Sequence, residues 1–196
     1  RSLIESWHGK GRNRYVITPR FAISCSTEQL IAAGRLHEQY PGTYIQTHLS
    51  ENKDEIDSTL SLCPDCQDYL EVYERARLVT DRSIFGHCIH LSDSECRRLV
   101  EAGSVVAHCP TSNLFLGSGL FDMQQANRVG MQTVLATDIG AGTSFSMLRT
   151  MGEAYKVQQL GGYPMSVFES LYKCTLGAAK ALHLDDEIGC FGKGRK

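Results

Sequence analysis

The chain has 196 residues, of which 42% are hydrophobic and 21% are charged, and its formal net charge is −2. This size and composition are typical of a soluble globular domain with a core of its own. The lysines and arginines are scattered and no apolar run approaches ~18 residues, so we expect neither nucleic acid nor a membrane as a partner.

The chain begins at Arg1 without a start methionine or an apolar signal core, and it ends in a run rich in glycine and lysine. The first residues have the character of the middle of a helix, and the last ones contain no strand pattern. We therefore expect the chain to be a part of a longer protein.

Short apolar runs alternate with helical stretches along the chain. Strands are predicted at residues 15–18, 43–48, 83–87, 104–108 and 132–137. Helices are predicted at residues 26–40, from 51, from 92, at 144–160 and at 166–182, with longer loops at 62–68 and 114–120. The helix from residue 92 opens on side chains suited to an N-cap.

This alternation is typical of βαβ units and predicts an α/β fold with a parallel sheet. Five units are too few to close an eight-stranded barrel, which needs ~250 residues. The candidates are therefore a doubly wound sheet or a part of a larger barrel. No glycine-rich nucleotide-binding fingerprint follows any strand, which weakens the first candidate.

The eight cysteines favour a reducing compartment, because several lie in apolar strand-like runs where a free thiol acts as a small hydrophobe. We expect the cytoplasm. Cys63 and Cys66 have CxxC spacing, but no second pair follows at the distance of a zinc ribbon. Loop thiols are the ordinary interpretation of this pair, and a structural metal site is the alternative.

Side chains that can carry chemistry stand where the predicted strands end. The second, third, fourth and fifth strands run into His48, His87, His108 and Asp138, and the first runs into residues 19–21. In parallel α/β folds the carboxyl ends of the strands form the active-site face. The series therefore predicts a functional site, here called the mouth, where the carboxyl ends of the strands meet at one edge of the sheet.

Each of these residues also has an ordinary interpretation. A histidine at a strand end can be structural, and Asp138 can cap the turn that follows it. Glu51 can be a first-turn helix acid, and Arg20 can form a surface ion pair. The shared location of all of them favours function over these separate alternatives.

His48, His87 and Asp138 carry the kinds of donor atom that bind Zn²⁺ or Fe²⁺. A divalent ion lowers the pKa of a water to ~7, and Glu51, three residues after His48, could move the protons. These residues predict metal-assisted hydrolysis. A catalytic zinc usually takes at least three protein ligands, so we expect one or more to be missing.

Five motifs identify a family. The chain resembles the amidohydrolase superfamily and, within it, the guanine deaminase family. The matching runs are residues 18–21 (TPRF), 47–52 (THLSEN), 86–87 (GH), 107–114 (AHCPTSNL) and 137–148 (TDIGAGTSFSML). Their order and spacing match over nearly the whole chain.

The resemblance implies a fold and a domain organisation. It implies an α/β fold that is the C-terminal portion, about strands 4–8, of a (β/α)8 TIM-type amidohydrolase barrel. Residues 1–185 would form this partial barrel. Residues 186–196 would begin a flanking β-domain.

The resemblance also implies catalytic and metal-binding roles. His48 and Asp138 would be metal ligands, and Asp138 would also act as a base. Glu51 would take a proton from the nucleophilic water and deliver it to the purine ring and the departing amine. His87 would polarise the attacking hydroxide and the developing tetrahedral centre.

Substrate contacts follow from the same resemblance. Arg20 would face the carbonyl and ring-nitrogen edge of guanine, and Phe21 would pack on the base. His48, His87 and Asp138 would also line the substrate site. The family shares His108, but we expect a structural role for it.

The implied reaction is the hydrolytic deamination of guanine to xanthine and ammonia by a metal-activated water. The implied cofactor is one Zn²⁺ per site, with Fe²⁺ as the alternative, and the implied assembly is a homodimer. The family takes two further ligands from a His-x-His pair, with a substrate-contacting glutamine after it, and this chain contains no such pair. We therefore expect the whole protein to be active and the chain alone to be inactive.

Two alternatives remain open at this point. Another amidohydrolase that acts on an aromatic ring, such as a triazine hydrolase or an adenosine-derivative deaminase, would share the metal pattern but should lack Arg20 and Phe21 in this context. A non-catalytic barrel fragment that serves assembly is the second alternative. The unrelated zinc deaminases need Pro-Cys-x-x-Cys, whereas Pro64 lies inside the pair here.

Overall fold

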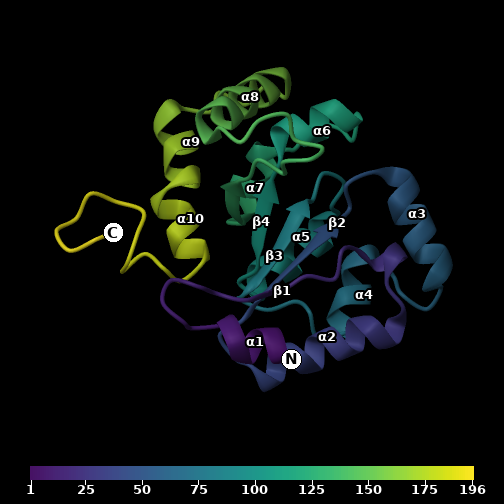
Figure 1. Cartoon of the computed structure of the whole chain (residues 1–196). Coiled ribbons are helices and arrows are strands. Elements are labelled where there is room, and N and C mark those ends of the chain that lie inside the picture. Colours follow the sequence, from purple (N-terminus) through teal and green to yellow (C-terminus); the bar gives the residue numbers. More distant parts are fainter.

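Five parallel strands form a single sheet in the computed structural model, which describes all residues from 1 to 196 (Figure 1). The strands are β1 Val16–Ile17, β2 Tyr44–Leu49, β3 Ser83–His87, β4 Val105–His108 and β5 Gln132–Leu135. Each strand pairs in parallel with the next one along the chain. All five predicted strands are thus confirmed, with small shifts at their ends.

Helices connect the strands and surround the sheet (Figure 1). The helices before β3 are α1 Ser2–Trp7, the short 3-10 helix η1 Ala22–Ser24, α2 Thr27–Gln39, α3 Lys53–Leu62 and α4 Tyr69–Arg75. Those after β3 are α5 Asp93–Glu101, α6 Pro110–Leu116, α7 Met123–Val129, α8 Met147–Leu160, α9 Val167–Cys174 and α10 Leu176–Ala181. No helix has the length and apolar character that crossing a bilayer requires.

The strand order in the sheet, β1-β2-β3-β4-β5, decides between the two candidate folds. A doubly wound sheet reverses its order at a switch point, as in 3-2-1-4-5-6. Successive strands of a (β/α)8 barrel instead lie side by side in chain order. The predicted α/β class is confirmed, and the topology is that of consecutive barrel strands.

Local signals explain the helices that were predicted correctly. Ser26 caps α2 by accepting a hydrogen bond from the backbone N–H of Gln29. Ser92 and Glu95 form the two reciprocal bonds of a capping box at the start of α5. These caps satisfy backbone donors that the first helical turn leaves free.

Three predicted helix and loop boundaries differ from those of the structure. The predicted helix at 166–182 is two helices, because Thr175 has φ −125° and ψ −103°, outside helical geometry. The predicted loop at 114–120 begins only after α6, which opens with Pro110 at its first turn. The helix expected from Glu51 begins at Lys53 with Asn52 as its N-cap, so Glu51 lies before it.

The buried core lies between the sheet and the helices. Its largest fully buried side chains include Tyr69, Tyr73, Phe85 and Leu99. Each large apolar side chain removed from water stabilises the fold by about 1.5–3 kcal/mol. After α10 the chain continues as a loop that projects from the body, and residues 186–196 form turns (Figure 1). That these residues begin a flanking β-domain stays a prediction.

Candidate active site

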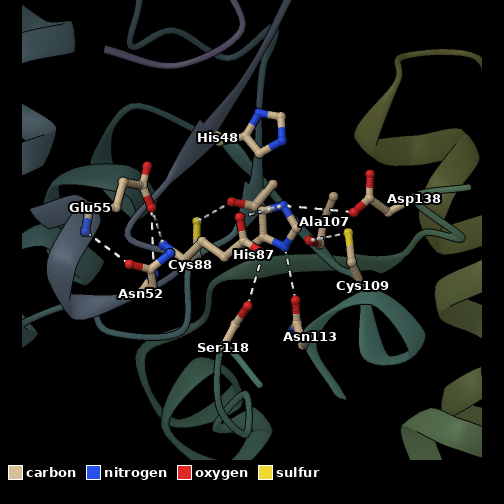
Figure 2. Close-up of polar contacts among 12 residues, drawn as sticks. His48, Asn52, Glu55, His87, Cys88, Ala107, Cys109, Asn113, Ser118 and Asp138 are labelled. Atoms are coloured by element: carbon tan, nitrogen blue, oxygen red, sulfur yellow. Dashed lines mark hydrogen bonds and ion pairs between the residues drawn. The ribbon is translucent and has the colours of Figure 1, made fainter. Parts of the chain in front are cut away.

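The carboxyl ends of the strands bring four of the predicted site residues together. His48 lies in β2, Glu51 follows it, His87 ends β3, and Asp138 lies beyond β5. The Nε2 atom of His87 is 3.6 Å from Oε2 of Glu51 and 3.9 Å from Oδ2 of Asp138. The rings of His48 and His87 stack with centroids 5.0 Å apart. His87 therefore stands at the centre of the cluster (Figure 2).

The backbone turns through the left-handed region where these residues sit. Ser50, His87 and Asp138 have φ values of 49°, 70° and 46°. Such a conformation costs a non-glycine residue of order 1–3 kcal/mol and tends to occur at functional sites. The turns point the side chains of neighbouring strands into one mouth.

The ordinary interpretations of Glu51, Asp138 and Arg20 do not apply in the structure. Glu51 precedes the N-cap of α3, and Asn52 does the capping. The Asp138 carboxylate makes no hydrogen bond to a neighbouring backbone N–H, and Arg20 forms no ion pair. None of the three side chains is therefore taken up by the helix cap, turn cap or surface ion pair that the ordinary interpretation gives it.

The ring of His48 is held in one orientation. Its Nδ1–H donates to the backbone carbonyl of Arg20 at 2.7 Å. The backbone N–H of Ala22 donates to the Tyr73 hydroxyl at 3.0 Å, and that hydroxyl donates to the carbonyl of His48 at 2.8 Å. These bonds connect the end of β2 to residues 20–22. The other ring nitrogen of His48, Nε2, has no hydrogen-bond partner and can bind a ligand.

His87 is supported from α6. Its Nδ1 lies 2.8 Å from Oδ1 of Asn113, an arrangement in which the ring N–H donates and the amide oxygen accepts (Figure 2). The other ring nitrogen, Nε2, faces the carboxylates of Glu51 and Asp138. This nitrogen therefore points toward the centre of the mouth.

Asp138 is positioned by a tight loop. The backbone N–H of Gly142 donates to the carbonyl of Asp138 at 2.6 Å. A Cβ atom at Gly142 would lie 1.8 Å from the carbonyl oxygen of Thr137, so only glycine fits this close approach. The glycine at position 142 is thus explained by the backbone turn that holds Asp138.

Arg20 and Phe21 lie beside this cluster. The Phe21 ring is tilted against the His48 ring at a centroid distance of 5.6 Å. The guanidinium carbon of Arg20 lies 5.1 Å from the centre of the Phe21 ring. The Arg20 side chain is exposed, so its planar set of donors is available to a ligand.

Two groups of potential metal donors share His87. His48, Glu51 and His87 form one group, and His87, Cys109 and Asp138 form the other, with donor atoms within 4.8 Å of one another in each. The imidazole and carboxylate donors, with the free Nε2 of His48, fit a borderline divalent ion. Cys109 fits less well, because burial raises its thiol pKa to about 12 and its S–H donates to the carbonyl of Ala107.

Two residues at the site were given no role by the sequence. Asn113 holds His87, and the hydroxyl of Ser118 donates to Oε1 of Glu51 at 2.9 Å (Figure 2). Asn113 lies in the 107–114 motif, so its position in the motif was an available signal. Nothing in the sequence indicates the partner of Ser118, which is 67 residues away.

His108 belongs to the interior rather than to the mouth. It is fully buried, its ring stacks on Phe121 with centroids 4.8 Å apart, and neither ring nitrogen has a hydrogen-bond partner. Burial lowers its pKa to about 3, so it stays neutral. These features fit the structural role expected of it.

The protein should therefore lose stability in acid through His108. Below about pH 6.5 an unfolded chain protonates this histidine while the folded chain does not, so the free energy of unfolding falls as pH decreases toward 3. At about 1.36 kcal/mol per unit, the loss at pH 4 is roughly 3 kcal/mol. Urea unfolding at pH 7 and pH 4 should show a smaller loss in the His108→Leu variant. Equal losses in the variant and the parent would contradict this account.

Known proteins match the chain along its whole length. The sequence model of the amidohydrolase family matches residues 1–196. Guanine deaminase of Escherichia coli K12 is 52% identical over 196 residues, which are 100% of this chain and 45% of that protein. Guanine deaminase of Mus musculus is 34% identical over 94% of this chain and 42% of its own length. The chain thus spans about half the length of the curated relatives it matches.

Solved structures agree with the fold. The E. coli guanine deaminase structure superposes with a TM-score of 0.97, covering 99% of this chain and 45% of its own. A C. acetobutylicum guanine deaminase with bound guanine in the active site has a TM-score of 0.90 at 32% identity, covering 98% and 47%. A triazine hydrolase variant, at 21% identity and a TM-score of 0.84, shares the fold alone. The five-stranded sheet is accordingly that of an amidohydrolase TIM-type barrel, and the chain belongs to the amidohydrolase family.

Proposed function

We propose that the protein carrying this chain is a metal-dependent guanine deaminase, which hydrolyses guanine to xanthine and ammonia. The observation that carries the proposal is the convergence of Glu51, His87 and Asp138 beside His48 at one edge of the sheet. Arg20 and Phe21 adjoin the same mouth. The guanine deaminases among the relatives, at up to 52% identity, support the choice of substrate.

His48 and Asp138 would hold the divalent ion. A bound ion of this kind lowers the pKa of a water molecule to ~7 and so makes a nucleophile available at neutral pH. His48 suits the role because its Nδ1 is engaged by Arg20 and its Nε2 is free. Asp138 suits it because a carboxylate oxygen adds the negative charge that a divalent ion favours.

Glu51 and His87 would move and orient protons. Glu51 would take one proton from the attacking water and deliver it to a ring nitrogen of guanine as the carbon–oxygen bond forms. The second proton of that water would then pass to the amine as the carbon–nitrogen bond breaks, which leaves the new carbonyl and releases ammonia. The Nε2 atom of His87, 3.6 Å from Glu51, faces the attacking oxygen and polarises it.

Arg20 and Phe21 would bind the guanine base. The guanidinium donates toward the carbonyl and ring-nitrogen edge of guanine, and the phenyl ring packs against the base. A site built to satisfy these polar groups rejects a purine that lacks them, since its own donors would stay unpaired. His48, His87 and Asp138 complete the lining at the reacting carbon.

Ligands from outside these 196 residues would complete the metal site. Two ligands are fewer than the three that catalytic zinc sites take from protein. We therefore expect the chain alone to bind metal weakly and to be inactive. The residues described here would form part of the site in the whole protein.

Zinc, a homodimer and the cytoplasm complete the proposal, with neither nucleic acid nor a membrane as a partner. An adenosine deaminase structure from Xanthomonas campestris with bound zinc shares the fold, at 24% identity and a TM-score of 0.90, and supports the choice of zinc. Large apolar side chains such as Leu148 on α8 and Phe168 on α9 are exposed, which suits a subunit interface. Buried thiols such as Cys88 and Cys96 suit a reducing compartment.

A substrate panel tests the proposed function. The whole protein, loaded with zinc, should release ammonia from guanine and leave adenine, cytosine and triazines largely unreacted. Turnover of a triazine in preference to guanine would instead support another branch of the family. Absence of turnover with every compound would support a non-catalytic role.

Loss of the Arg20 side chain should weaken guanine binding. Hydrogen bonds to a charged group contribute about 1.5–3 kcal/mol, so Arg20→Leu should raise KM for guanine roughly 10- to 100-fold. The backbone carbonyl that holds His48 remains in the variant, so metal content should not change. Arg20→Lys keeps the charge but not the planar guanidinium, so its KM for guanine should lie between that of the parent and that of Arg20→Leu. Unchanged KM in Arg20→Leu would remove this residue from the substrate site.

A further inference from the structure

The two oxygens of the Glu51 carboxylate have different neighbours. Oε1 accepts a hydrogen bond from the Ser118 hydroxyl at 2.9 Å, and Oε2 lies 3.6 Å from Nε2 of His87. The Glu51 side chain is only 13% exposed. One oxygen is thus held by the protein while the other faces the centre of the mouth.

Without Ser118 the carboxylate would have another place to go. A largely polar cavity of about 630 Å³ is lined by Glu51 and Ser118 themselves and, further out, by Lys53, Asp54 and His90 among others. A glutamate side chain has three rotatable bonds, and a carboxylate is favoured near water and an ammonium group. No other hydrogen bond to the Glu51 carboxylate is present in the chain. The Ser118 hydroxyl is therefore what opposes rotation toward the cavity.

Ser118 is itself held firmly. Its backbone N–H donates to the carbonyl of Asn113 at 2.9 Å, and Nε2 of His90 donates to the Ser118 carbonyl at 3.0 Å. Gly119 follows with φ +134°, and a Cβ atom there would lie 3.0 Å from Cγ2 of Ile89. Only glycine suits that backbone and that approach. Ser118, 8% exposed, is thus fixed between α6 and the segment after β3.

We propose that Ser118 is a positioning residue for the proton shuttle, holding Oε1 of Glu51 so that Oε2 stays turned toward His87 and the reacting atoms. The inference rests on the proposed deamination, and it assigns a purpose to the glycine-flanked segment after α6. His90 acts one step further out, through the carbonyl of Ser118. A misplaced catalytic group can cost about 100-fold in rate, which sets the scale of the expected effect.

Kinetics of the zinc-loaded whole protein test this role. Ser118→Ala should lower kcat for guanine about 10- to 100-fold, with KM and metal content little changed, since the Ser118 hydroxyl bonds Glu51 and neither of the proposed ligands His48 and Asp138. Ser104→Ala is the matched control. It likewise removes a buried serine hydroxyl, in this case one that donates to the backbone carbonyl of Thr80 at 2.8 Å, at the amino end of β4 and away from the site. This control should lower stability and leave kcat unchanged.

A double-mutant cycle separates positioning from a general structural effect. If Ser118 acts through Glu51, then Ser118→Ala should change kcat little when Glu51→Gln is already present. Equal losses in both backgrounds would overturn the proposal, as would a single Ser118→Ala variant with the parental kcat or one that loses its metal. Absence of deamination by the parental protein would instead refute the proposed function itself.

Discussion

Replacing Glu51 with glutamine should lower kcat for guanine by about 10²- to 10⁴-fold, the contribution of a general acid–base group. Glutamine keeps the shape of the side chain, and its amide oxygen can still accept the bond from Ser118. It cannot carry a proton from water to the base. The loss should therefore appear in kcat, measured by steady-state xanthine formation, with KM little changed.

Metal content of the Glu51→Gln protein distinguishes a proton shuttle from a ligand. Glu51 lies in one of the two potential donor groups, with His48 and His87. If Glu51 moves protons only, the variant should retain as much metal as the parent. A variant that loses its metal along with its activity would reassign Glu51 to the coordination sphere.

Replacing Asp138 with alanine should also lower activity strongly, because the proposed metal site would lose a ligand. Loss of a residue that merely supports a ligand weakens metal binding about 10- to 100-fold, so loss of the ligand in Asp138→Ala should exceed 100-fold. Activity should fall with it. Competition against a chromophoric chelator measures the affinity, and elemental analysis of the purified protein measures the occupancy.

Cys109 provides the control for the Asp138 prediction, because its sulfur belongs to the same donor group. Its raised pKa keeps the thiol protonated, and its S–H is engaged by Ala107. Cys109→Ala should therefore retain the metal. Loss of metal from Cys109→Ala but not from Asp138→Ala would exchange their roles.

Strands and capped helices could be predicted because their signals are local. Ile84 and Phe85 form a short apolar run between Ser83 and His87, and β3 spans residues 83–87. The short helices α4 and α7 were not predicted, although Asp68 and Asp122 cap them. Each has seven residues, which is too short for the apolar periodicity that identifies longer helices.

The site divides in the same way between local and distant information. His48, His87 and Asp138 could be chosen as candidates because each stands at a strand end, and parallel strands place those ends together. The contact between Ser118 and Glu51 depends on how α6 turns back over the segment after β2, which no local pattern encodes. The break at Thr175 between α9 and α10 likewise depends on packing against β5, with which both helices are in contact.

The most direct test of metal-dependent guanine deamination uses the whole protein with its metal removed and then restored. The restored protein should convert guanine to xanthine and ammonia in a 1:1 ratio, as one hydrolysed amino group requires, and the rate should rise in proportion to bound zinc. The stripped protein should be inactive. Guanine left unchanged by the fully loaded protein, or consumed at the same rate without metal, would contradict the account.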